Sequence, residues 1–183
     1  MVRHGESPKT EGNERTRGLT DKGRSDAHLI TELLKDEGID TLVSSPYRRA
    51  ILTIEELAES LGKEILVFED LREMVFVSDD TILSDKEVYP LVKEMFSNPD
   101  FSLNGGQSLN ICQNRSITTL RNILKIHKGQ NIVIGTHGAI MTLMMGYFDS
   151  QYDLDFLLKT SKPDIFRMEF NEEELIEVKR LWK

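Results

Sequence analysis

The stretch of residues 131–138, Asn-Ile-Val-Ile-Gly-Thr-His-Gly, indicates the fold class of this chain. Its Ile-Val-Ile run is apolar enough for a strand that is covered on both faces, as in a parallel sheet between helices. The apolar residues 139–147 follow directly and favour a helix. His137 therefore stands at the carboxyl end of a buried strand, which is where open α/β sheets bind ligands.

Strands and helices alternate on both sides of this stretch, as judged from hydrophobic spacing and turn residues. The predicted helices are residues 19–37, 46–61, 88–96, 108–127 and 139–147. The predicted strands are residues 40–44, 64–68, 131–135, 165–170 and 175–181. This order predicts an α/β fold, a three-layer α/β/α sandwich with a mainly parallel central sheet. We find no repeat or linker, so we expect residues 1–183 to form one domain.

The charge balance bears on the partners of the protein. The net charge is -8 and the sequence pI is near 5.1, which argues against nucleic acid because binding to phosphate backbones needs a basic surface. A small phosphorylated substrate needs only a few converging cations, so it stays compatible with an acidic chain.

The location of the protein is predicted from what interrupts its apolar segments. No apolar run approaches the roughly 18–20 residues that span a bilayer. Arg3, His4 and Glu6 interrupt the start before a signal-peptide core could form. We therefore expect a cytoplasmic protein without a membrane span. The single cysteine, Cys112, rules out an internal disulfide and a cysteine-rich metal site.

Arg3-His4-Gly5 is the first candidate for chemistry. A histidine that attacks a phosphoryl group must present a neutral ring nitrogen, and a neighbouring guanidinium suits the phosphoryl oxygens. Gly5 leaves room for the substrate near the backbone. Taken alone, however, these residues are more typical of a surface histidine near a chain terminus.

Two further segments follow predicted strands. Residues 45–50, Ser-Pro-Tyr-Arg-Arg-Ala, would bring a helix N-terminus and an arginine to an anion, and we expect the other arginine, Arg48, to be solvated. Glu73 could act as general acid to a leaving oxygen and then as base to water, or it could be a surface glutamate.

His137 is held between strand and helix and could donate a hydrogen bond to a transferring phosphoryl group. The alternative is a buried histidine whose hydrogen bonds are satisfied by the protein. A metal is disfavoured, because His4 and His137 lack short ligand spacing and the arginines would repel a cation.

Taken in order, these segments resemble the histidine phosphatase superfamily, the phosphoglycerate-mutase-like proteins. The resemblance rests on residues 3–7, 19–23, 44–50 with Thr53 and Glu55, 71–73, 105–108 and 136–138. It implies a phosphoglycerate-mutase-like fold, a phosphohistidine on His4 and a proton donor at Glu73. It also implies a phosphate pocket that is formed by Arg3, Arg49, His137 and Gly138, with no metal and no cofactor. Arg49 fits better than Arg48 because the family's arginine directly precedes an alanine.

The resemblance implies a phosphatase that acts on a small phosphorylated substrate or a phosphoprotein. Two alternatives remain: a mutase, which returns the phosphoryl group to its bound product, and a catalytically silent phosphate-binding module. Mutases of this family are usually longer, and the intact set of site residues argues against the silent module. We expect residues 75–104 to form a lid. The natural substrate and the oligomeric state are not indicated.

The chain departs from the family pattern at three places. Met1 and Val2 alone precede Arg3, so we expect either a very short first strand or further native residues before it. Thr10 stands where many relatives have asparagine, and Asn13 and Arg17 are candidates to replace it. Gln107 stands where a glutamate is common.

Overall fold

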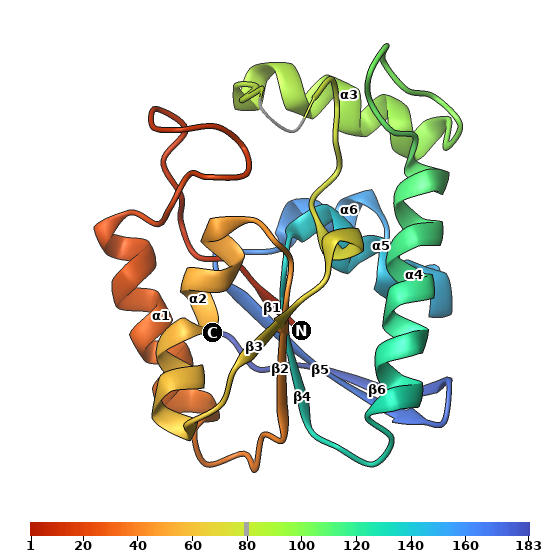
Figure 1. Cartoon of the computed structure of the whole chain (residues 1–183). Coiled ribbons are helices and arrows are strands. Elements are labelled where there is room, and N and C mark those ends of the chain that lie inside the picture. Colours follow the sequence, from red (N-terminus) through yellow and green to blue (C-terminus); the bar gives the residue numbers. More distant parts are fainter. Residues whose placement is uncertain (79–80) are drawn as a thin grey trace.

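A six-stranded sheet forms the centre of the computed structural model, which describes residues 1–78 and 81–183 (Figure 1). The strand order is β3-β2-β4-β1-β5-β6. The strands are β1 (Val2–Arg3), β2 (Thr41–Ser44), β3 (Ile65–Val67), β4 (Ile132–Thr136), β5 (Asp164–Asn171) and β6 (Glu174–Arg180). Strands β1 to β4 pair in parallel, whereas β5 runs antiparallel to β1, and β6 antiparallel to β5.

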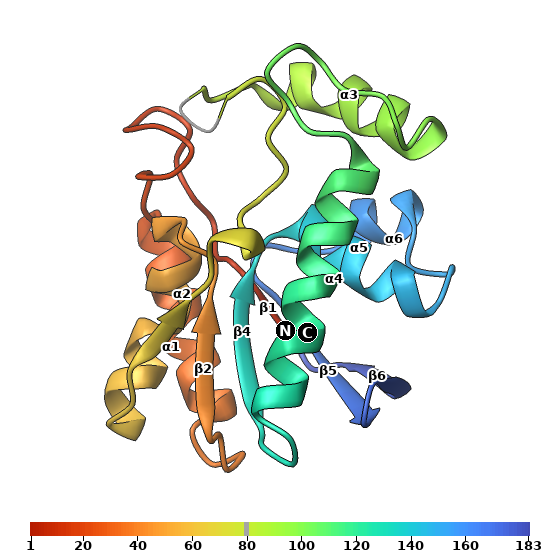
Figure 2. The same cartoon turned by 45° about the vertical axis from the view of Figure 1, so that its right-hand side comes forward.

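Helices cover both faces of this sheet (Figures 1 and 2). On one face lie α1 (Asp21–Leu34) and α2 (Arg48–Leu61), and on the other lie α4 (Leu109–Ile126) and α5 (Gly138–Phe148). Side chains of a strand point alternately to the two faces, so Leu42 packs in the core under α1 and α2. Val43 packs in the core under α4 and α5. The predicted three-layer α/β/α sandwich is confirmed.

The structure differs from the predicted elements mainly at the carboxyl edge of the sheet. Helix α3 (Asp85–Ser97) begins at Asp85 rather than at residue 88, because Ser84 and Glu87 form a capping box there. A 3-10 turn, η1 (Glu69–Leu71), and the short helix α6 (Leu154–Lys159) were not predicted. Helix α3 lies beyond the carboxyl edge of the sheet, near the end of α4, and belongs to the segment 75–104 for which a lid was predicted (Figures 1 and 2). Residues 79–80 of that segment lie outside the described part.

The first strand is two residues long and nevertheless lies in the middle of the sheet. Val2 is paired with Gly135 of β4 on one side and with Ile165 of β5 on the other. Arg3 is paired with Thr136 and Asp164 in the same way. This pairing fixes the direction in which the chain leaves the sheet at His4.

The chain after His4 crosses the first turn of α1 at very close range. A Cβ atom on Gly23 would lie 2.3 Å from the carbonyl oxygen of Glu6, and one on Gly5 would lie 3.0 Å from the carbonyl oxygen of Gly23. No side chain fits at the first of these positions without a backbone shift. Because neither glycine carries a side chain, the segment after His4 can lie directly against the helix.

This close approach predicts the sign of one substitution. Alanine in place of a helical glycine normally stabilises a protein by roughly 0.8–1.0 kcal/mol. We expect Gly23→Ala instead to lower the free energy of unfolding by about 1–3 kcal/mol, because it overpacks against backbone. Urea denaturation checks this, with Ser25→Ala on the exposed face of α1 as the control. A Gly23→Ala protein as stable as the control would contradict the close approach.

Candidate active site

Residues that follow three parallel strands meet at the carboxyl edge of the sheet. His4 follows β1, Ser45 follows β2 and His137 follows β4. The amide of His4 donates to the carbonyl of Thr136 at 3.0 Å, and the amide of Ser45 donates to Gly135 at 2.9 Å. The pairing of the strands thus continues into the site. The rings of His4 and His137 contact edge to face, with their centroids 5.2 Å apart.

The imidazole of His4 is buried and held in one orientation. Its Nδ1 atom lies 2.7 Å from the carbonyl oxygen of Gly5. A carbonyl oxygen can only accept, so we infer that Nδ1 carries the proton and that Nε2 presents its lone pair. Arg49 Nε donates to that Nε2 at 3.1 Å. The amide of Gly5 donates to Thr53 Oγ1 at 3.0 Å, which fixes the peptide that holds His4.

His137 is fully buried and only half satisfied. Its Nε2 atom lies 2.7 Å from Ser45 Oγ. Because Ser45 Oγ accepts from the amide of Tyr47 at 3.2 Å, its hydroxyl proton is free to be donated to Nε2, which leaves the ring proton of a neutral His137 on Nδ1. That Nδ1 atom has no hydrogen-bond partner among residues 1–78 and 81–183. Nearly all buried polar side-chain atoms have a partner, so an unpaired ring nitrogen beside His4 points to a ligand site. The alternative of a histidine fully satisfied by the protein does not fit this geometry.

Both histidines are neutral at neutral pH. Burial lowers the pKa of His4 well below its ordinary value, and the charge of Arg49 lowers it further. Burial likewise lowers the pKa of His137, again with a contribution from Arg49. An unprotonated His4 is the form that can attack an electrophile.

Arg49 enters the site from the first turn of α2 and is almost completely buried, at 1% exposed. One of its terminal nitrogens donates to the carbonyl of Glu14, and the other lies 3.0 Å from the Glu14 carboxylate. The guanidinium also stacks on the ring of Tyr47 at 4.9 Å. Burial lowers the pKa of Arg49 to about 10, so it stays cationic at neutral pH. As predicted from sequence, its neighbour Arg48 is exposed.

Arg3 lies flat over the first residue of α5. A Cβ atom on Gly138 would lie 2.6 Å from Arg3 Cζ, so glycine is required for this approach. Arg3 Nη1 donates to the carbonyl and hydroxyl oxygens of Thr160, whereas Nε has no partner within the described ranges. His137 caps α5 without a side-chain hydrogen bond to the helix. The helix N-terminus and the Arg3 guanidinium therefore face the same space, which suits an anion.

Arg17 is a second buried arginine, at 7% exposed. It donates to Ser7 Oγ at 2.6 Å and pairs with Glu14 at 3.1 Å. Its charge contributes to lowering the pKa of His4, after burial and the charges of Arg49 and Arg3. Of the two candidates to replace the family asparagine, Arg17 lies near the site.

Asn13, the other candidate, accepts from the amides of Arg15 and Thr16 and so shapes the loop. Thr10 is exposed. In the sequence, a glutamate at position 14 followed by an arginine at position 17 is compatible with this ion pair, but it does not indicate that the pair is buried.

Glu73 follows η1 and is half-buried. One carboxylate oxygen accepts from the amide of Met74 at 2.9 Å. Burial lowers the pKa of the Arg3 and Arg49 guanidinium groups, and the charge of Glu73 opposes that shift in both. The carboxylate of Glu73 is therefore close enough to both arginines to affect their pKa values.

The described ranges contain no group of three or more histidine, cysteine, aspartate or glutamate side chains that could hold a metal ion. Within those same ranges, no helix is long and apolar enough to cross a membrane.

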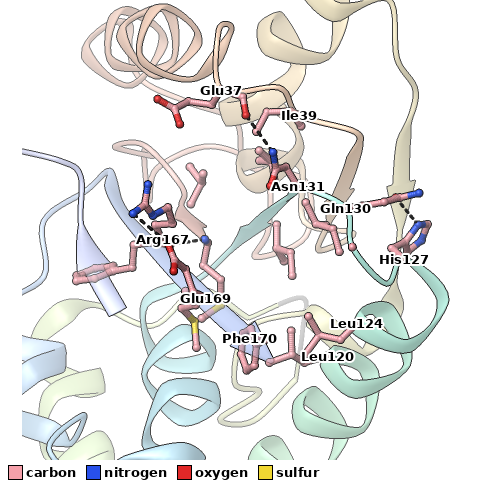
Figure 3. A pocket seen from close by; sticks show the side chains of 18 of the residues that line it. Glu37, Ile39, Leu120, Leu124, His127, Gln130, Asn131, Arg167, Glu169 and Phe170 are labelled. Carbon is pink, nitrogen blue, oxygen red and sulfur yellow. Dashed lines mark hydrogen bonds and ion pairs between the residues drawn. The ribbon is translucent and has the colours of Figure 1, made fainter. Parts of the chain in front are cut away.

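A cavity of about 950 Å³ lies away from these histidines, at the amino ends of the parallel strands (Figure 3). Its lining includes residues 132–134 of β4 and residues 166–168 of β5. Its walls include Leu120, Leu124 and Phe170. None of the proposed site residues lines this cavity.

Two named proteins of other organisms are similar to this chain in sequence. Phosphoglycerate mutase-like protein 4 of Arabidopsis thaliana is 32% identical over 153 residues, which cover 77% of this chain and 66% of the relative. Phosphoserine phosphatase 1 of Hydrogenobacter thermophilus is 30% identical over 155 residues, covering 79% and 72%. The chain thus spans about two thirds of the length of the first relative.

Solved structures agree on the fold. A mycobacterial glucosyl-3-phosphoglycerate phosphatase superposes with a TM-score of 0.77 at 18% identity, over 99% of this chain and 95% of that one. Residues 1–180 match the histidine phosphatase superfamily (branch 1), as the resemblance in the sequence suggested. The chain belongs to that superfamily.

Proposed function

We propose that this chain hydrolyses small phosphomonoesters through a covalent phosphohistidine on His4. One observation carries the proposal. The Nε2 lone pair of a buried, neutral His4 lies within hydrogen-bond distance of Arg49, and the His4 ring contacts the ring of His137, whose Nδ1 has no partner within the described ranges. A nucleophile surrounded by fixed donors is what phosphoryl transfer requires, because catalysis there is mostly positioning and electrostatics.

In the first step, the substrate phosphoryl oxygens bind Arg3, Arg49 and His137, with the N-terminus of α5 at Gly138 beside them. Arg49 then exchanges its bond to His4 for bonds to the phosphoryl group. His4 Nε2 attacks phosphorus while the bond to the ester oxygen breaks, and Glu73 gives its proton to that oxygen. The alcohol leaves, and the Gly5 carbonyl stabilises the proton on Nδ1 of the phosphorylated ring.

In the second step, water attacks phosphorus from the side that the alcohol has left. Glu73, now a carboxylate, takes a proton from the water as the bond from phosphorus to Nε2 breaks. Inorganic phosphate leaves and His4 is restored with its Nε2 lone pair. The only groups that change protonation are Glu73 and the reacting oxygens.

The proposed substrate is a small phosphorylated metabolite in the cytoplasm. Two relatives are named as a phosphoserine phosphatase and a glucosyl-3-phosphoglycerate phosphatase, which supports this class. Nucleic acid is disfavoured by the net charge of -8. A mutase is the second candidate, because a relative named phosphoglycerate mutase-like protein matches 77% of the chain.

Two assays on the same preparation separate these candidates. We expect release of inorganic phosphate from p-nitrophenyl phosphate and no interconversion of 2- and 3-phosphoglycerate. Interconversion that is faster than phosphate release would make the chain a mutase. If neither activity is found across a panel of phosphorylated metabolites, the remaining candidate is the silent phosphate-binding module.

The nucleophile is tested by trapping. Phosphohistidine is stable in alkali and labile in acid, so a brief reaction with labelled substrate and an alkaline quench should leave label on His4. His4→Ala should retain none, and Glu73→Gln should retain more than the unmodified protein if hydrolysis needs Glu73 as base. Acid-stable label, or label that persists in His4→Ala, would point to another nucleophile.

A neutral His4 also predicts how stability depends on pH. The pKa of His4 is lowered on folding, so protonation below the unfolded value of about 6.5 favours the unfolded chain. Its contribution to stability is complete above pH 6.5 and is lost as the pH falls below it. We expect the slope of unfolding free energy against pH, measured by urea denaturation between about pH 6.5 and 5, to decrease in His4→Gln by up to about 1.4 kcal/mol per pH unit.

The exposed His28 provides the control for this measurement, since its pKa is raised by the hydrogen bond to Glu56 rather than lowered. His28→Gln should change the slope in the opposite direction or leave it unaltered. An identical slope in His4→Gln and in the unmodified protein would mean that folding does not lower the pKa of His4.

A further inference from the structure

Glu73 lies on a segment that has little regular structure of its own. After η1 ends at Leu71, residues 72–78 form neither helix nor strand. The Glu73 carboxylate is oriented by the neighbouring Met74 amide at 2.9 Å, a bond that moves with the segment. Something outside the segment must therefore set where Glu73 lies relative to Arg3, His4 and Arg49.

Arg115 of α4 contacts this segment through its backbone. Its Nη1 atom donates to the carbonyls of Asp70 and Arg72 at 2.6 and 2.8 Å, and its Nη2 atom donates to the carbonyl of Glu73 at 3.0 Å. The planar, rigid fork of a guanidinium can hold several acceptors in one arrangement. A single side chain thus binds three carbonyl groups around the proposed proton donor.

Gln107 completes this arrangement from the other side. The side-chain Oε1 atom of Gln107 accepts from Arg115 Nη2 at 3.2 Å. The backbone amide of Gln107 donates to the carbonyl of Val75 at 2.7 Å. Gln107, just before α4, is thus bound both to Arg115 and to the segment that carries Glu73. Gln107, which stands where a glutamate is common in the family, therefore acts as a neutral hydrogen-bond acceptor for Arg115.

We propose that Arg115 is the positioning residue of the reaction: it holds the Glu73 backbone so that the carboxyl group reaches the leaving oxygen. The proposal rests on the proposed function, in which Glu73 is the general acid. Arg115 does not touch the phosphoryl group, so its loss should impair protonation of the leaving group and spare phosphate binding. A displacement of about 1 Å can cost roughly 10²-fold in rate.

The leaving group makes this measurable. A nitrophenolate leaves without a proton, whereas an alkoxide such as that of glycerol does not, so only the alkyl ester needs the general acid. We expect Arg115→Ala to lower kcat/KM for glycerol phosphate by about 10²-fold or more, and for p-nitrophenyl phosphate by less than about 5-fold. The parameter kcat/KM covers the steps up to release of the alcohol, so later hydrolysis does not mask the difference.

Two further variants, a control on the same helix and a conservative substitution of Arg115, help to interpret the result. Arg121 lies on the same helix and binds Tyr147 and Glu173. Arg121→Ala should therefore leave the ratio of the kcat/KM values for the two substrates unchanged. Arg115→Lys keeps the charge but cannot hold three carbonyls in one plane, so it should shift the ratio in the direction of Arg115→Ala. If Arg115→Ala does not fold, Arg115→Lys decides the matter.

Equal losses on both substrates in the Arg115 variants would overturn the proposal, because they indicate a merely structural role. Glu73→Gln separates this failure from failure of the proposed function. A Glu73→Gln protein that is selectively slow on glycerol phosphate, beside Arg115 variants that are not, would refute the positioning role alone. Equal losses in Glu73→Gln would refute the general acid, and with it both claims.

Discussion

In the middle of the sheet, Val2 lies opposite Gly135 and Arg3 opposite Thr136, and this register determines which residues meet at the carboxyl edge. Parallel strands end at the same edge, so the residues that follow, His4 and His137, leave the sheet side by side. A shift of one residue would turn the side chains of β1 to the opposite faces and place Val2 where Arg3 now lies. The contact between the two imidazoles thus depends on the pairing of a two-residue strand.

Charge acts locally in this protein. The chain carries a net charge of -8, yet Arg3, Arg17 and Arg49 surround two neutral histidines. Glu14 pairs with Arg17 and Arg49 and offsets part of their mutual repulsion. Burial and these cations keep His4 unprotonated, and the same cations favour a phosphoryl dianion. One arrangement of charge therefore serves both the nucleophile and its substrate.

Much of this arrangement could be predicted from the sequence, because it depends on local patterns and on strand order. The alternation of apolar runs with helical spacing predicted the sandwich, and the residues just after predicted strands included His4 and His137. The start of α3 was predicted three residues too late, although Ser84 and Glu87 carry the sequence pattern of a capping box. By contrast, the burial of Arg17 depends on how an irregular loop folds back. The contact between Arg115 and the backbone around Glu73 joins residues more than forty positions apart and leaves no sequence signal.

The central claim is that His4 is a neutral imidazole with its proton on Nδ1 and a free lone pair on Nε2. Nitrogen-15 NMR of the histidine-labelled protein reads both properties directly, with His4→Gln assigning the signal. At about pH 6.5 an ordinary histidine is half protonated. The account predicts that His4 is then uncharged, with a protonated Nδ1 bound to the Gly5 carbonyl and an unprotonated Nε2. An imidazolium, or a neutral ring with its proton on Nε2, would contradict it.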